Sequence, residues 1–354
     1  MPGDFLIVGS GAVGLTSALV LLQSGHRVTL LDRGGAGQEA SWAGGGILSP
    51  LCPWDYPEPV TRLALRGMAL FGEAAAALHD ATGIDPEYRK SGMLLLPPYR
   101  EEIAASWCAQ HEFALRRVEL DGYLPGQRGA GLLLPEVAQV RNPRLLLALR
   151  RRVEMLGGTI IEQCEVQRFE LAGDRVGALQ TSQGRFAADA YVLAAGAWSK
   201  TLLGEHALAL DIRPIRGQML LFRFDAPPFE PVLLRESLYL IPRRDGHVLA
   251  GSTLEDVGFD KSTTGEARDE LMRQVLAIFP EWRGLEPVQQ WSGLRPASPD
   301  NIPTIGRHPH LANLYANCGH FRYGVTMSFA SAELLLNGIE GGAQAISPGA
   351  YRWQ

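Results

Sequence analysis

Residues 4–33 read DFLIVGSGAVGLTSALVLLQSGHRVTLLDR, and this stretch decides the fold. The apolar run at residues 5–8 is typical of a buried parallel strand. Apolar residues then recur at helical spacing until Gly25, which can end a helix. A second apolar strand follows at residues 27–31. The stretch therefore predicts the strand, helix and strand that begin a Rossmann-type α/β fold.

The turn between the first strand and the helix carries glycines in the spacing G-x-G-x-x-G. Gly9 permits the tight turn, Gly11 lets the backbone approach a pyrophosphate, and Gly14 lets helix and strand pack closely. The N-terminus of the helix offers free N–H groups to phosphates. Asp32, at the end of the second strand, can accept hydrogen bonds from the ribose of an adenosine. This arrangement favours dinucleotide binding over an ordinary glycine turn.

The composition is that of an ordinary globular protein. The chain has 354 residues, which favours about two domains, with 46% apolar and 20% charged residues. The net charge of −5 argues against nucleic acid as a partner, and the basic cluster at residues 150–152 is interpreted as a solvated helix face.

Four scattered cysteines, Cys52, Cys108, Cys164 and Cys318, show no metal-ligand or disulfide spacing, so we expect no metal and a reducing cytoplasm. The first strand begins almost at Met1, which predicts no signal peptide. No apolar stretch is long enough to span a bilayer, and we expect no membrane span.

A glycine-rich segment at residues 34–50 is predicted to contain no helix or strand interior. Because it also carries Trp42, Ile47 and Leu48, we interpret it as a loop that lines a cofactor rather than a flexible linker. A later buried strand at residues 191–195 opens directly onto Gly196, which indicates another cofactor contact at the same sheet edge.

The remaining pattern predicts mixed structure. Helices are expected at residues 59–81, 100–113, 142–156, 267–279 and 325–336, with Asn142 as an N-cap before Pro143. Strands are expected at residues 91–96, 159–161, 166–171, 176–181, 185–188, 217–224, 237–242, 247–252, 288–294 and 314–318. Only one dinucleotide fingerprint is present, which favours a flavin reduced directly by its organic substrate but leaves a nicotinamide-dependent dehydrogenase open.

Several motifs in order resemble the FAD-dependent D-amino-acid oxidase superfamily, and within it the glycine oxidases of thiamine thiazole biosynthesis. They are the fingerprint with Asp32, the loop at residues 41–46, AAGAWS at 194–199, WSGLRP at 291–296 and GHFR at 319–322. The resemblance runs from residue 5 to about residue 336. It implies a two-domain protein, with a glutathione-reductase-like FAD-binding Rossmann domain (residues 1–80, 140–210 and 299–354). An antiparallel-sheet substrate domain would take residues 81–139 and 211–298.

The resemblance implies that FAD is bound without a covalent link. The matching positions around it are Gly9, Gly11, Ala12, Val13, Gly14, Asp32, Arg33, Ser41, Ala43, Gly45, Gly46, Ile47, Val166, Ala195, Gly196, Trp198, Gly319, His320, Phe321, Arg322, Tyr323, Gly324, Val325 and Thr326. The N-terminus of the last helix would suit the negative charge of the reduced flavin.

Three residues match the substrate contacts of the family. Arg295 would hold the substrate carboxylate through two parallel hydrogen bonds, with a structural arginine as the alternative. Tyr239 would close over the same carboxylate, and Arg322 would either pack or contact substrate. For His320 we favour support of the flavin loop over service as a base.

The reaction implied is oxidation of glycine, sarcosine or a small D-amino acid by molecular oxygen, giving a 2-oxo acid, ammonia and hydrogen peroxide. Thiazole synthase is an implied partner, and a homo-oligomer, a tetramer, is the implied assembly. Alternatives are a D-amino-acid or secondary-amine dehydrogenase that reduces a quinone, an RNA-modifying oxidase module, and a flavin subunit of a larger complex. Ile47, Leu254 and Tyr323 depart from the family pattern, so the pocket shape is left open.

Overall fold

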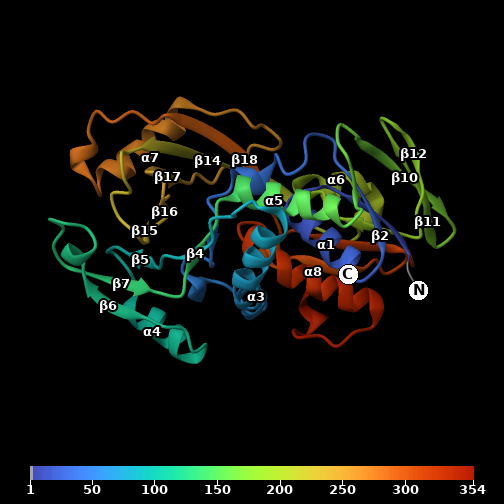
Figure 1. Ribbon diagram of the computed structural model, residues 1–354, viewed down its shortest axis with the longest axis horizontal. Helices are drawn as coiled ribbons and strands as arrows, with labels where there is room; N and C mark the ends of the chain where they lie inside the picture. The colour runs from blue at the N-terminus through green and yellow to red at the C-terminus, as the bar shows by residue number, and fades with distance from the viewer. Residues whose placement is uncertain (1–2) are drawn as a thin grey trace.

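The computed structural model describes residues 3–354. Within them two large sheets stand side by side (Figure 1). The first has six strands in the order β19-β20-β13-β1-β2-β9, and the second has eight in the order β18-β14-β17-β16-β15-β5-β7-β6. The predicted α/β fold class, a Rossmann-type unit beside an antiparallel sheet, is confirmed. The division of residues between two domains stays a prediction.

The six-stranded sheet is parallel except for its edge strand β19. Its central strands β1, β13 and β20 are almost wholly buried, as expected where both faces of a parallel sheet are covered. The strands are β1 (Asp4–Val8), β2 (Arg27–Leu31), β9 (Thr159–Ile161), β13 (Ala190–Leu193), β19 (Thr304–Arg307) and β20 (Leu314–Cys318).

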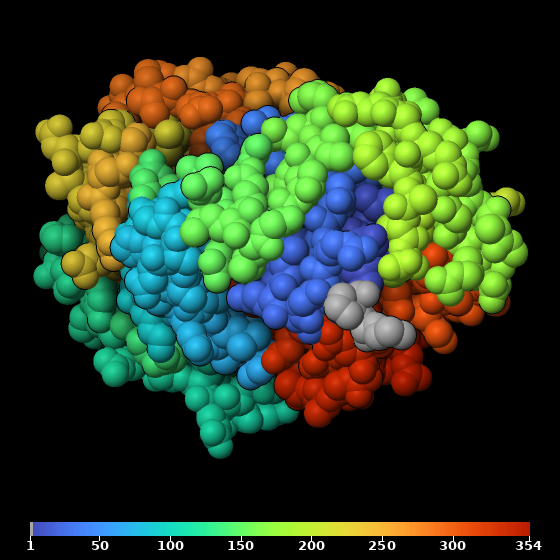
Figure 2. All heavy atoms as spheres, turned by 45° about the vertical axis from the view of Figure 1, so that its right-hand side comes forward, coloured from blue at the N-terminus to red at the C-terminus, as the bar shows by residue number. Residues whose placement is uncertain are grey.

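Helices cover one face of this sheet and a small meander covers the other. The helices are α1 (Ala12–Gln23), α3 (Glu58–Thr82), α5 (Asn142–Met155) and α8 (Gly324–Glu340), which share one hydrophobic core. The meander consists of β10 (Val166–Ala172), β11 (Arg175–Thr181) and β12 (Gly184–Phe186). α1 packs against α8, so the two ends of the chain meet, as the blue and red surfaces do in Figure 2.

The eight-stranded sheet is antiparallel apart from one parallel pair, β5 with β15. α7 (Gly265–Leu276) packs on one face and α4 (Glu101–Gln110) on the other. The strands are β5 (Met93–Leu95), β6 (Arg116–Glu119), β7 (Ala130–Leu134), β14 (Arg213–Arg223), β15 (Val232–Arg235), β16 (Leu238–Pro242), β17 (His247–Gly251) and β18 (Gln289–Ala297). Of these, β6, β7 and β15 were not predicted from the sequence.

Two local predictions are wrong. The glycine-rich segment contains a one-turn helix, α2 (Ala40–Ala43), and a short strand, β3 (Ile47–Leu48), because both stretches are free of glycine. β3 pairs with β8 (Ala138–Gln139), which also pairs with β4 (Arg89–Lys90). Asn142 is not an N-cap: Arg141 occupies that position, and the Asn142 side chain donates to the carbonyls of Ser41 and Gly44 instead.

Across residues 3–354, none of the helices combines the length and the apolar character needed to traverse a lipid bilayer.

Candidate cofactor and substrate site

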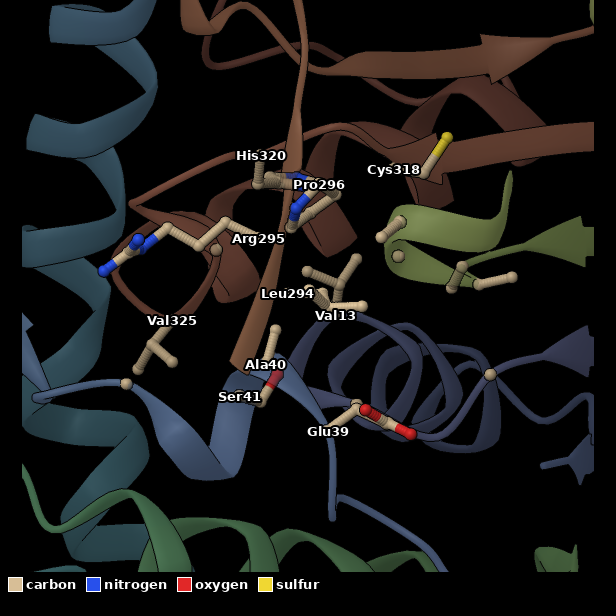
Figure 3. A pocket seen from close by; sticks show the side chains of 18 of the residues that line it. Val13, Glu39, Ala40, Ser41, Leu294, Arg295, Pro296, Cys318, His320 and Val325 are labelled. Carbon is tan, nitrogen blue, oxygen red and sulfur yellow. The ribbon is translucent and has the colours of Figure 1, made fainter. Parts of the chain in front are cut away.

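A cavity of about 580 Å³ lies where the carboxyl ends of the parallel strands face the eight-stranded sheet. Figure 3 shows Val13 and Ser41 from the first sixty residues on its wall, together with Arg295 and His320 from the last sixty. Ligands of open α/β sheets bind at this edge. The segments that were predicted separately therefore meet at one site.

Almost every predicted cofactor residue lines this cavity. Those on the wall are Gly9, Gly11, Val13, Asp32, Arg33, Ser41, Gly45, Gly46, Ile47, Val166, Ala195, Gly196, Trp198 and all residues at 319–326. Arg295 and Tyr239 line it too. Ala12, Gly14 and Ala43 lie behind the wall. The Ala12 amide donates to Ser41 Oγ, and the Ala43 carbonyl accepts from the indole of Trp291.

The first and third glycines of the spacing, Gly9 and Gly14, cannot carry a side chain without a clash. Gly9 has φ +101°, and a Cβ there would lie 2.4 Å from the Ala194 carbonyl oxygen. A Cβ on Gly14 would lie 2.0 Å from the Gly9 carbonyl oxygen. Both glycines are thus fixed by contact of the helix with the strands. Gly11 is different: its Cβ direction meets only Ser41 Oγ, at 3.2 Å, on the cavity side.

Asp32 holds the turn together. Its Oδ2 accepts from the backbone N–H of Ser10 at 2.8 Å and from Ser10 Oγ at 2.5 Å, while Oδ1 accepts from the Gly34 N–H at 3.0 Å. An ionised carboxylate offers about four acceptor sites. One site is thus left for a hydroxyl in the cavity.

Two helix N-termini converge on the cavity, those of α1 and α8. Neither of these helices, which lie wholly within the described residues, has an acidic residue in its first turn or a capping side chain from its N-cap residue. The positive ends of both helix dipoles therefore remain available to an anionic ligand. This pair fits a dinucleotide whose central pyrophosphate lies at one helix N-terminus and whose electron-accepting ring lies at the other.

The loop at residues 44–46 forms part of the wall beside Tyr239. A Cβ on Gly45 would lie 2.5 Å from Ile241 Cδ1 and 3.2 Å from Tyr239 Cε2. The Gly45 carbonyl accepts a hydrogen bond from Arg243 Nη2 at 2.7 Å. The loop backbone therefore packs directly on side chains of β16.

Arg295 lies on β18 with its guanidinium against Gly217 of β14, where a Cβ would lie 2.1 Å from Nη1. Nη2 donates to Ser252 Oγ at 2.5 Å and Nη1 donates to the Thr253 carbonyl at 3.1 Å. Among the described residues no carboxylate pairs with it. The pKa of Arg295 is lowered, chiefly by burial. Tyr239 acts in the opposite direction, and the nearby Arg322 cation lowers the pKa further.

Tyr239 and Arg322 flank this guanidinium from two different elements. Tyr239 is 8% exposed, and its hydroxyl lies 3.8 Å from Met219 Sδ. Arg322 is exposed at the cavity rim, with its Cζ 5.5 Å from the centre of the Phe321 ring. Two cations and a phenol therefore face the same end of the cavity.

His320 is 2% exposed, and burial lowers the pKa of its ring to about 3. The imidazole is therefore neutral at physiological pH. Its Nε2 is buried without a hydrogen-bond partner in the described part of the chain. Leu254 is 54% exposed and absent from the cavity wall, whereas Ile47 and Tyr323 both line it.

Side-chain contacts also join the cavity wall to the segment between β17 and α7. Glu39 pairs with Arg33 at 3.0 Å and with Lys261 at 3.1 Å. Trp198 stacks on Phe259 with ring centres 5.4 Å apart, and the Arg33 guanidinium lies 3.5 Å from the Trp198 ring centre.

Sequence reasoning missed several residues of the site, among them Asn142, Gly217, Arg243 and Ser252. Each of the four acts on a partner far away in the chain, and the local motif that contains Asn142 predicted a helix cap and not this contact. Within residues 3–354 no group of three or more metal-ligating side chains comes together.

The fold and the cavity define a dinucleotide-binding protein with a second sheet that faces the bound ligand. The profile of the family described as "FAD dependent oxidoreductase" matches residues 4–337. The chain therefore belongs to this family, and it is a flavoprotein amine oxidoreductase with FAD as its cofactor.

Relatives sharpen this assignment. The chain is 41% identical to a glycine oxidase of Pseudomonas aeruginosa, over 98% of this chain and 97% of the relative. It is 33% identical to a bifunctional protein ThiO/ThiG of Synechocystis sp., covering 94% of this chain but 51% of that longer protein. Its structure is similar to that of glycine oxidase from Geobacillus kaustophilus, with a TM-score of 0.93, 26% identity, and coverage of 100% and 98%.

Proposed function

We propose that this enzyme oxidises glycine and other small amines, such as sarcosine and small D-amino acids. With oxygen and water the products are a 2-oxo acid (glyoxylate from glycine and from sarcosine), hydrogen peroxide, and ammonia from a primary amine or methylamine from sarcosine. The observation that carries the proposal is the Arg295 guanidinium, which faces the cavity and is paired only with the neutral oxygens of Ser252 and Thr253. A buried cation without an acid partner is suited to an anionic ligand.

Arg295 binds the substrate carboxylate, and Tyr239 on β16 donates a hydrogen bond from its hydroxyl to the same carboxylate. Arg322 adds positive potential at the rim that draws the anion in. Because the carboxylate is fixed by two directed bonds, the Cα–H of a small amino acid is fixed as well. Gly217 leaves the space in which the guanidinium lies.

The glycine turn and Asp32 would hold FAD, which would supply the two-electron oxidation of the substrate and its own reoxidation by oxygen. The residues assigned to it are the wall residues named above, with Ala12, Gly14 and Ala43 supporting them from behind. No side chain needs to take a proton, because the substrate amine reacts in its neutral form. We therefore expect the rate to rise with pH as the substrate ammonium deprotonates.

Two finer assignments belong to the same proposal. The ThiO/ThiG proteins join a chain like this one to a second part, which supports supply of an imine to thiazole synthesis and thiazole synthase as a partner. The four free cysteines fit a reducing cytoplasm. The tetramer stays a prediction.

The test is an anaerobic titration of purified holoenzyme with glycine, sarcosine and D-alanine, followed by admission of oxygen. Bleaching of the flavin and stoichiometric peroxide are the expected results. Bleaching without peroxide would instead indicate a dehydrogenase that uses a quinone. No bleaching by any of the three amines would refute the proposed substrate class.

A further inference from the structure

Arg243 directly follows β16, the strand that carries Tyr239, and its side chain is buried at 4% exposure. Nη1 donates to Gln139 Oε1 at 2.9 Å and to the Val140 carbonyl at 2.8 Å, and Nη2 donates to the Gly45 carbonyl at 2.7 Å. The guanidinium therefore joins three segments of the chain at one point.

All three acceptors are neutral. The nearby acids Glu87 and Asp245 hydrogen-bond to Arg141 instead. Burial lowers the pKa of Arg243 to about 10, so the side chain remains protonated at neutral pH. Burying a cation without a carboxylate costs several kcal/mol, and an apolar side chain of similar volume is often as stable or more so. Stability alone thus does not account for an arginine here.

One of the three acceptors, the Gly45 carbonyl, belongs to the loop at residues 44–46, and the other two belong to the adjacent segment at residues 139–140. The Val140 N–H donates to the Gly46 carbonyl at 2.9 Å, and a Cβ on Gly46 would lie 2.2 Å from the Val140 carbonyl oxygen. Gly45 lies against the Tyr239 ring on its other side. Arg243 thus fixes the backbone of the loop to the strand that positions the tyrosine.

We propose that Arg243 is a positioning residue. It sets the distance between the loop at residues 44–46 and Tyr239, and thereby fixes the position of the flavin relative to the substrate carboxylate. The inference rests on the proposed function, in which this loop flanks the flavin and Tyr239 binds the carboxylate. Arg243 itself touches neither ligand, because it lies behind the wall.

The neighbouring Arg244 supplies a matched control. It has the same charge, its side chain is 58% exposed, and its closest acid, Asp85, is 3.9 Å away. The experiment compares wild-type holoenzyme with Arg243→Met, Arg243→Lys and Arg244→Met. The dissociation constant of glycolate, the unreactive hydroxy analogue of glycine, is read from the flavin absorption. The visible circular dichroism of the flavin reports its surroundings.

In Arg243→Met we expect the glycolate constant to rise at least about tenfold and the flavin dichroism to change, because a small misplacement in a site is costly. Arg243→Lys keeps the charge and part of the hydrogen bonding, so its constant should lie between the two. Arg244→Met should match wild type. A wild-type constant and dichroism in Arg243→Met, with only a lower melting temperature, would show a merely structural role and overturn the proposal.

Two further outcomes are also decisive. Should Arg243→Met not retain FAD, Arg243→Lys carries the test: a raised glycolate constant supports the proposal and a wild-type constant refutes it. If wild type binds no glycolate and is not reduced by glycine, the proposed substrate is wrong. The flavin dichroism alone then decides whether Arg243 positions the loop at residues 44–46. A changed spectrum in Arg243→Met but not in Arg244→Met then supports control of the loop, and unchanged spectra in both refute it.

Discussion

The six-stranded and the eight-stranded sheet meet at one cavity but contribute different chemistry to it. The first offers mainly backbone: the turn at Gly9 and Gly11, and the N-termini of α1 and α8. The second offers side chains: the guanidinium of Arg295 and the phenol of Tyr239. A site made of backbone groups suits an anionic cofactor, which is the same in every turnover. Side chains on strands can be substituted in evolution to suit a different substrate.

The largest expected effect is on substrate binding, and it comes from removing the Arg295 side chain of the eight-stranded sheet. Losing one partner of a buried, hydrogen-bonded charge pair costs about 2–5 kcal/mol, so Arg295→Ala should weaken binding of a carboxylate about 30- to 4,000-fold. FAD content should stay as in wild type. Glycolate titration and the flavin absorption of the purified protein measure both quantities. Loss of FAD in this variant would mean that Arg295 is structural.

Gly217→Ala tests the same contact without touching the arginine. The added methyl group would lie 2.1–2.3 Å from the guanidinium atoms, so Arg295 must leave its place over β14. We expect weaker glycolate binding with FAD retained, in the same direction as Arg295→Ala and smaller. Unaltered binding would show that the guanidinium position is not critical.

The next effect is on FAD binding, and it comes from obstructing the glycine turn beside the six-stranded sheet. Gly11→Val places two methyl groups in the path of the pyrophosphate. Overpacking costs about 1–3 kcal/mol, so the dissociation constant of FAD should rise about 5- to 150-fold. Apoprotein titration with FAD, followed by flavin fluorescence, measures it. Gly122→Val, at a position with open space, is the matched control. An FAD dissociation constant of Gly11→Val equal to that of wild type would contradict the glycine assignment.

The last prediction concerns the dependence of stability on pH. Folding lowers the pKa of His320 from 6.5 to about 3. Between these values the unfolded chain binds a proton that the folded chain does not, so the free energy of unfolding should fall as the pH drops through this window. Above pH 6.5 the His320 ring is neutral in both states, and it no longer lowers the free energy of unfolding. His320→Gln should flatten the slope by about 1.4 kcal/mol per pH unit. Urea unfolding across this range measures the slope, with His79→Gln as the exposed control; an unchanged slope would count against a neutral, buried ring.

The two sheets also differ in what could be predicted from the sequence. The first strand–helix–strand unit is contiguous, so Gly9 and Gly14 could be assigned from spacing alone, and the strand at 27–31 matches β2. Arg295 could be found only through the resemblance, since no local pattern marks it. Arg243 could not be found, because its partner Gly45 lies 198 residues away.

The glycine-rich segment shows a similar limit. Its contact with a cofactor cavity could be predicted from composition, but α2 and β3 could not, because pairing with β8 stabilises β3 from a distant part of the chain. The predicted cap at Asn142 failed for the same reason. Its amide has tertiary partners, the carbonyls of Ser41 and Gly44, in place of the local backbone N–H groups.

The cavity wall draws on residue 8 and on residue 326, with β20 and the start of α8 completing it. During synthesis the glycine turn therefore leaves the ribosome long before its opposite wall exists. A nascent chain that ends short of α8 has no enclosed space for a dinucleotide. We therefore expect stable retention of FAD only after α8 has been synthesised.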